Sequence, residues 1–132
     1  MVIHVEIKFV LTIEKFLVAL GALFGLCGII LAAMSGHMKA LPNLRIASDI
    51  CLFHAPALIA ILAARRTGLF HSTLSLIASA VLAVGVILFC GDILFRSFQG
   101  YALVPMLAPL GGGIMMLGWL LTMFSVFGTT RS

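Results

Sequence analysis

The 132-residue chain is 63% hydrophobic and only 9% charged, and its formal net charge at pH 7 is +4. Soluble domains are about 45–50% apolar and about 25% charged, so this composition excludes a soluble globular domain, a disordered chain and a disulfide-rich secreted scaffold. The basic residues form no run longer than a pair, which is untypical of nucleic-acid binding. The composition predicts an integral membrane protein with one domain over residues 1–132, surrounded by the lipid bilayer, with no nucleic-acid partner.

The first predicted transmembrane helix covers residues 14–36. A bilayer core about 30 Å thick needs about 20 apolar residues in a helix, and no residue between Lys15 and His37 is charged. This stretch exceeds the apolar region of a signal peptide, about 7–15 residues, so we expect a retained helix. Apolar and polar residues alternate over 3–9, as in a strand. A lone strand would have no partner, so we interpret this segment as an interfacial tail that leads into the helix.

Three further helices are predicted over residues 44–64, 69–92 and 105–127. The charged turn at Arg65-Arg66 separates the first two of them. Residues 97–130 carry no charge but exceed one span, so their first part is expected to form a loop. Short connections make neighbouring helices antiparallel. The predicted fold class is therefore all-α, an integral membrane four-helix bundle.

The distribution of Lys and Arg predicts the orientation in the membrane. The side with both termini and the second connection would hold Lys8, Lys15, Arg65, Arg66 and Arg131. The opposite side would hold Lys39, Arg45 and Arg96. The positive-inside rule then predicts that both termini lie in the cytoplasm.

Small residues indicate where the helices pack, because close backbone approach holds helices together in lipid. Gly21 and Gly25 form a GxxxG pair, and Pro109 followed by three glycines is expected to kink or loosen the last helix. Gly112 and Gly118 are expected on buried contacts, and Trp119 in the core. The predicted packing residues are Gly21, Gly25, Pro109, Gly111, Gly112, Gly118 and Trp119.

His54 is the candidate intramembrane polar site. It precedes Arg65 by about 16 Å of helix, which places it near the bilayer midplane. An ionisable residue at that depth indicates a functional site, but a neutral imidazole can also be satisfied by one hydrogen bond to a neighbouring helix. We expect structural packing; a proton or substrate path and metal or haem ligation are the alternatives.

Three further polar residues are predicted to gather at the outer mouth of the bundle: His37, Asp49 and Asp92. Asp92 should lie at the far interface, where Arg96 is one helical turn away and could form an exposed, weak ion pair.

No metal site, cofactor or catalytic residue is expected. Cys51 and His54 share a helical face that Cys90 could approach, but such spacing arises easily by chance. The chain also carries no known motif of a hydrolase, nucleotide-binding enzyme or zinc enzyme, so we do not expect an enzyme.

Four blocks follow one another along the chain: LAAMSGHMKAL (31–41), LFHAPALIAILAA (52–64), ILFCGDILF (87–95) and LAPLGGGIMMLGWLL (107–121). This series resembles the domain of unknown function 423 family, which includes small bacterial inner-membrane proteins and the animal transmembrane protein 256. The resemblance implies a location in the inner (plasma) membrane. Pro109, Gly111, Gly112, Gly118 and Trp119 form the most specific block, and His37 and His54 match two histidines of the family. This chain has Ile50-Cys51 where the family has Tyr-Gln, and Cys90 and Asp92 where it has two serines. The resemblance implies a four-helix membrane topology and no established activity.

The predicted function is a non-enzymatic accessory or assembly subunit of a membrane complex, or a homo-oligomeric bundle. Its partners would be other membrane-protein subunits or a second copy of itself. The alternative is a small proton or solute permease or channel that uses His54, and a lipid-binding role is a third possibility.

Overall fold

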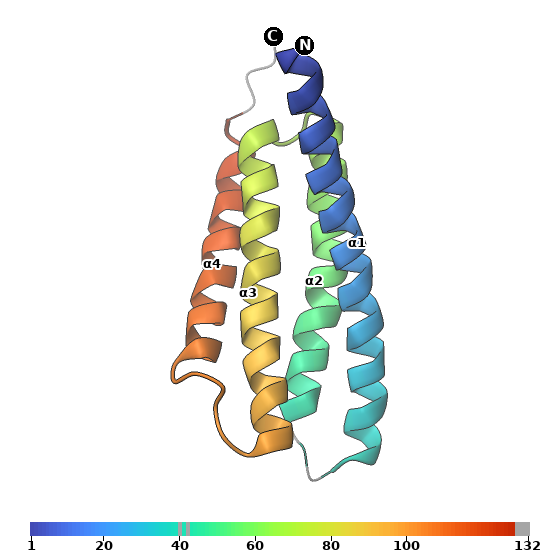
Figure 1. Cartoon of the computed structure of the whole chain (residues 1–132), viewed down its shortest axis with the longest axis vertical. Coiled ribbons are helices and arrows are strands. Elements are labelled where there is room, and N and C mark those ends of the chain that lie inside the picture. The colour runs from blue at the N-terminus through green and yellow to red at the C-terminus, as the bar shows by residue number, and fades with distance from the viewer. Residues whose placement is uncertain (40, 42, 129–132) are drawn as a thin grey trace.

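The computed structural model describes residues 1–39, 41 and 43–128 and contains four α-helices in this part of the chain. They are α1 (Val2–His37), α2 (Asn43–Arg66), α3 (Ser72–Gln99) and α4 (Leu107–Ser125). Each is long and apolar enough to cross a membrane, and the described residues form no strand. The helices run antiparallel to their chain neighbours (Figure 1). The predicted all-α membrane bundle is confirmed.

Two helices extend beyond the predicted spans. α3 continues to Gln99, where Gly100 ends it in the left-handed conformation with φ of 79°. α1 begins at Val2, so the alternating residues 3–9 are its first turns and not a strand. Its 36 residues measure about 54 Å, well over a bilayer core of about 30 Å. The N-terminal turns therefore project past the other helices (Figure 1).

Pro109, expected to kink or loosen the last helix, does not interrupt α4, because the helix starts later than residue 105. Pro109 is the third residue of α4, within the first turn, where a backbone N–H would have no partner inside the helix. The helix continues without interruption through Gly111, Gly112 and Gly113.

The helices are arranged as a row in which α1 and α4 flank a central α2–α3 pair (Figure 1). α1 packs mainly on α2, and α4 packs mainly on α3. The buried residues of α1 alternate at spacings of three and four: Glu14, Leu17, Gly21, Phe24, Gly28 and Leu31. Those of α4 do the same: Gly111, Met115, Gly118, Thr122 and Ser125. Such a narrow stripe is typical of a helix with a single neighbour.

Close backbone approach joins each outer helix to its neighbour. A Cβ atom on Gly111 would lie 2.6 Å from the backbone nitrogen of Phe89, and one on Gly118 would lie 2.6 Å from Leu82 Cγ. On the α1–α2 side, a Cβ on Gly28 would lie 2.6 Å from Leu52 Cγ, and the carbonyl of Gly28 accepts a 2.8 Å hydrogen bond from Ser48 Oγ.

The other predicted packing glycines lie in less crowded positions. A Cβ on Gly21 would lie 3.3 Å from the carbonyl oxygen of Ala55, and one on Gly25 3.6 Å from Ala55 Cβ. Gly112 was expected on a buried contact but lies at its edge, where a Cβ would lie 3.8 Å from the Phe89 ring. The reason is the rotation of about 100° between successive helical residues, which turns Gly112 away from the face that Gly111 presents to α3.

Candidate functional site

His54 lies inside α2, and its ring nitrogens both have hydrogen-bond partners. The side chain is buried, at 4% exposure. Nδ1 lies 2.9 Å from the carbonyl oxygen of Ile50, and Nε2 lies 3.3 Å from the indole Nε1 of Trp119 in α4. Since the indole N–H can only donate, Nε2 accepts and Nδ1 carries the proton that the carbonyl accepts. This network describes a neutral imidazole.

Trp119 forms the partner of this histidine and does not fill the core as expected. It is 38% exposed, and its indole N–H reaches His54 in α2. Its ring lies 6.0 Å from the His54 ring between centroids, and the exposed Phe53 contacts the His54 ring edge-on and the Trp119 ring at a tilt. The pair links α2 and α4 across the helix row.

The geometry of His54 limits its chemistry. Binding a metal ion or a second proton at Nε2 would require the lone pair that accepts from Trp119. The described residues contain no group of three or more His, Cys, Asp or Glu side chains that could hold a metal ion. Cys51 and Cys90 do meet, with 3.6 Å between their sulfur atoms, and Cys90 also lies 3.6 Å from the carbonyl oxygen of Ala47. This contact joins α2 to α3.

The three predicted mouth residues occupy different environments. His37 is exposed at the end of α1. Asp49 is exposed and accepts a 3.0 Å hydrogen bond from Arg45. Asp92 is fully buried, at 0% exposure.

The burial of Asp92 differs from the expected exposed position, because the connection after α3 folds back over it. Its carboxylate accepts a 2.7 Å bond from Arg96 Nε and a 3.2 Å bond from the backbone N–H of Leu103. The ion pair with Arg96 is present as expected. Asp92 thereby fixes the path of the α3–α4 connection.

A buried charge cluster at the opposite end of the bundle was not singled out from the sequence. Glu14 is 5% exposed, and its two carboxylate oxygens accept hydrogen bonds from Arg65 and Arg66. Arg65 also donates from Nε to the carbonyl oxygen of Ser72 at 2.6 Å. The cluster therefore ties α1, the end of α2 and the start of α3 together.

Residues 30–112 match the family described as "Protein of unknown function (DUF423)". The match covers more than half of the chain. The chain belongs to the DUF423 family. No curated protein and no solved structure shows significant similarity to it.

The DUF423 match covers the end of α1, all of α2 and α3, and the beginning of α4. It includes His54, Asp92 and the Arg65-Arg66 pair, whereas Glu14 and Trp119 lie outside it. The His54–Trp119 hydrogen bond and the ion pairs of Glu14 with the two arginines thus each join a residue within the DUF423 match to one beyond it. Together with its four apolar helices, the family assignment makes this chain a small multi-pass membrane protein.

Proposed function

We propose that the protein is a non-enzymatic accessory or assembly subunit of an inner-membrane complex, or a homo-oligomeric bundle. The observation that carries this proposal is the narrow buried stripe on each of α1 and α4. In the most apolar 18-residue stretch of α1 and of α4, only 28% of the residues are buried, against 44% in α2 and in α3. The outer helices therefore have large faces without a neighbour in the described part of the chain.

One feature of α4 favours a helix, and not only lipid, on such a face. Gly113 is exposed, and a Cβ built on it would meet no atom within 4 Å. A glycine on an outward face allows the backbone of another helix to approach closely, which is how helices associate in lipid. Leu110, three residues before it, and Leu117, four residues after it, are also exposed. This face can therefore hold a close helix contact.

The charge distribution supports cytoplasmic termini. The end of α2 lies at the same end of the row as the start of α1 (Figure 1), so Arg65 and Arg66 share that end with Lys8 and Lys15. Arg131, which was counted on this side, lies outside the described residues. An excess of basic residues on the cytoplasmic side sets the orientation.

The permease alternative receives no comparable support. A relay histidine needs a free nitrogen lone pair and a hydrated path, whereas both nitrogens of His54 are bonded within the protein.

Photo-crosslinking in intact membranes tests the assembly proposal. A photoreactive phenylalanine analogue placed at Leu23 on α1 or at Met116 on α4 reports on the two outer faces, since both residues are exposed. Val84, exposed on the central helix α3, is the matched control. We expect Leu23 or Met116 to give one discrete adduct, either a dimer of this chain or one partner of constant mass. The absence of a discrete adduct at both positions, or the same adducts from Val84, would contradict the proposal.

A further inference from the structure

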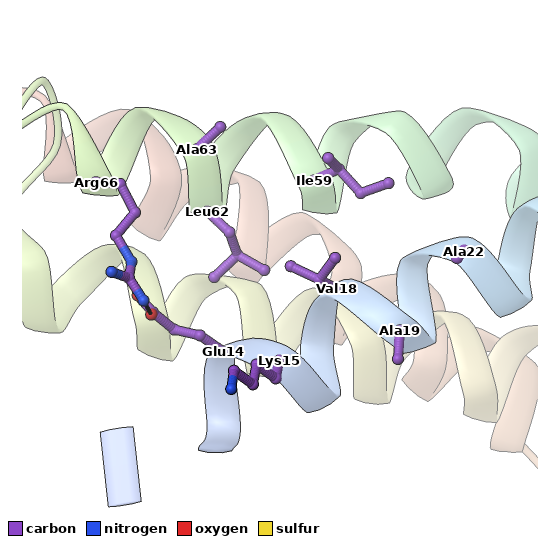
Figure 2. Close-up of a pocket in the computed structure, with 9 residues that line it drawn as sticks. All are labelled: Glu14, Lys15, Val18, Ala19, Ala22, Ile59, Leu62, Ala63 and Arg66. Carbon is purple, nitrogen blue, oxygen red and sulfur yellow. Dashed lines mark hydrogen bonds and ion pairs between the residues drawn. The ribbon is translucent and has the colours of Figure 1, made fainter. Parts of the chain in front are cut away.

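An apolar groove lies between α1 and α2 on the outer surface of the helix row. It forms an open hollow of about 440 Å³. Its apolar wall consists of Val18, Ala19, Ala22, Ile59, Leu62 and Ala63. The groove stays open because the side chains of Ala19, Ala22 and Ala63 are too small to fill the space between the two helices. Figure 2 shows these apolar side chains extending along the two helices away from a charged end.

The charged end of the groove carries an excess of positive charge. Glu14, Lys15 and Arg66 line it, and Arg66 turns towards Glu14 (Figure 2). Arg65 binds the same carboxylate, and Glu6 lines an adjoining pocket together with Glu14, Arg65 and Arg66. Lys15 is exposed and forms no ion pair with the residues that the structure describes. Two acids and three bases leave this end with a surplus of one positive charge, and Lys15 is the cation available to an anion.

The dimensions of the groove correspond to one leaflet of the bilayer. From Glu14 to Ala22 the helix rises about 12 Å, which is less than half of a hydrocarbon core of about 30 Å. Arg66 is the last residue of α2, where the chain leaves the apolar region. The cations thus lie at the level of lipid headgroups and the apolar wall at the level of acyl chains.

We propose that this groove binds one anionic phospholipid, whose phosphate contacts Lys15 and Arg66 and whose acyl chain lies along the apolar wall. Basic pockets between transmembrane helices bind lipid headgroups in this way. The site does not depend on the assembly proposal, because all of its residues belong to a single chain. It gives the α1–α2 pair a lipid ligand at the end of the molecule that carries the buried Glu14 cluster.

Native mass spectrometry of the purified full chain in detergent, with added lipid, tests this site. The probes are dioleoylphosphatidylglycerol, dioleoylphosphatidylcholine and glycerol phosphate, which has the headgroup phosphate without acyl chains. We expect one bound phosphatidylglycerol in preference to phosphatidylcholine, and no retained glycerol phosphate. Lys15→Gln should lower phosphatidylglycerol binding about fivefold, the factor that corresponds to about 1 kcal/mol per cation near an anionic surface. Ala22→Leu should abolish the preference by filling the groove.

Two matched variants separate the groove from general effects. Lys8→Gln removes the same charge from an exposed position on α1 outside the groove, and Ala33→Leu adds the same bulk at an exposed position of α1. Both should bind phosphatidylglycerol as the wild type does. Lys15 and Ala22 are themselves exposed, so thermal unfolding should show all four variants to be folded. Equal retention of the two lipids, retention of glycerol phosphate, or equal losses in Lys8→Gln and Lys15→Gln would overturn the proposal.

Discussion

At the scale of single residues, the polar groups inside this protein act as connectors between helices. His54 joins α2 to α4 through Trp119, and Glu14 joins α1 to both arginines that end α2. Asp92 holds the connection between α3 and α4. The partners in these contacts lie in different parts of the chain, so helical spacing in the sequence does not reveal them. They depend on which helices become neighbours.

A double-mutant cycle on His54 and Trp119 measures how much their hydrogen bond contributes to the free energy of unfolding. His54→Gln should be tolerated, because an amide can replace one donor or acceptor of the ring. His54→Leu and Trp119→Phe should each lower the free energy of unfolding in mixed micelles modestly. Their coupling energy should be about 0.6 kcal/mol, the average for interhelical hydrogen bonds in membranes.

Proton uptake by proteoliposomes gives an independent readout of His54. If the imidazole only packs, wild type, His54→Gln and His54→Leu should all show the same negligible leak. Uptake by the wild type that both variants lose would assign a proton path to this histidine, because neither replacement titrates near neutral pH.

Replacing Glu14 should weaken the end of the bundle at which α2 ends and α3 begins. Glu14→Gln leaves Arg65, whose side chain is only 10% exposed, without its carboxylate partner. Breaking a buried ion pair from one side costs about 3–5 kcal/mol. We expect about 3 kcal/mol or less in denaturant unfolding, since Arg66 remains accessible to solvent. Glu6→Gln, at an exposed position of α1 without an ion pair among the described residues, is the control and should have no effect.

At the scale of helices, three successive glycines in α4 face three different surroundings. A Cβ on Gly111 would clash with the backbone of α3, one on Gly112 would lie at van der Waals distance from the Phe89 ring, and one on Gly113 would meet no atom within 4 Å. Two residues, or about 200° around the helix, thus separate a crowded contact from an open surface. Propensity is the same at all three positions, so any difference among substitutions comes from packing.

A leucine series across these glycines tests the α3–α4 contact. Gly111→Leu should sharply reduce folded protein in the membrane, because a Cβ there would lie 2.6 Å from the Phe89 backbone nitrogen and 2.9 Å from the Gly85 carbonyl oxygen. Gly112→Leu should lower the thermal midpoint slightly, and Gly113→Leu should leave the folded monomer intact. Equal expression and thermal stability of all three variants would show that α4 does not approach the backbone of α3 closely at Gly111.

The helices themselves were predictable, because about 20 consecutive apolar residues can satisfy a lipid core only as a helix. The first turns of α1 were not, since the alternating residues 3–9 do not show helical periodicity. Pro56 was no obstacle, since the predicted span 44–64 runs through it and α2 is continuous there; a membrane helix tolerates a proline inside it.

The candidate site was only partly predictable. The distance to Arg65 singled out His54 as a polar residue far from the helix ends, but its partner Trp119 lies 65 residues away and becomes a neighbour only through the order of the helices. Glu14 was not singled out, because in the sequence it is only an acid at the start of the first predicted span. Its burial required α1 and α2 to pair in the register that brings it to the end of α2. The burial of Asp92 required the path of a loop, which hydropathy does not specify.

At the scale of the whole molecule, the row of helices leaves two outer faces without a neighbouring helix in the described part of the chain. In a closed bundle, α1 and α4 would pack against each other, and each would bury a wider stripe. Here each buries one stripe of alternating spacing, α1 mainly against α2 and α4 mainly against α3, with few contacts beyond that neighbour, such as the Trp119–His54 bond. This arrangement is the central reason to regard the protein as one part of a larger membrane assembly.

The mass of the particle extracted directly from native membranes into polymer-bounded lipid discs tests that claim most directly. The account predicts a particle that contains at least two polypeptide chains, either copies of this 14.0 kDa chain or this chain with one constant partner. It also predicts that Gly113→Leu, which leaves the fold intact, reduces the fraction of that particle. A wild-type particle that holds a single copy of this chain and lipid alone would contradict the account.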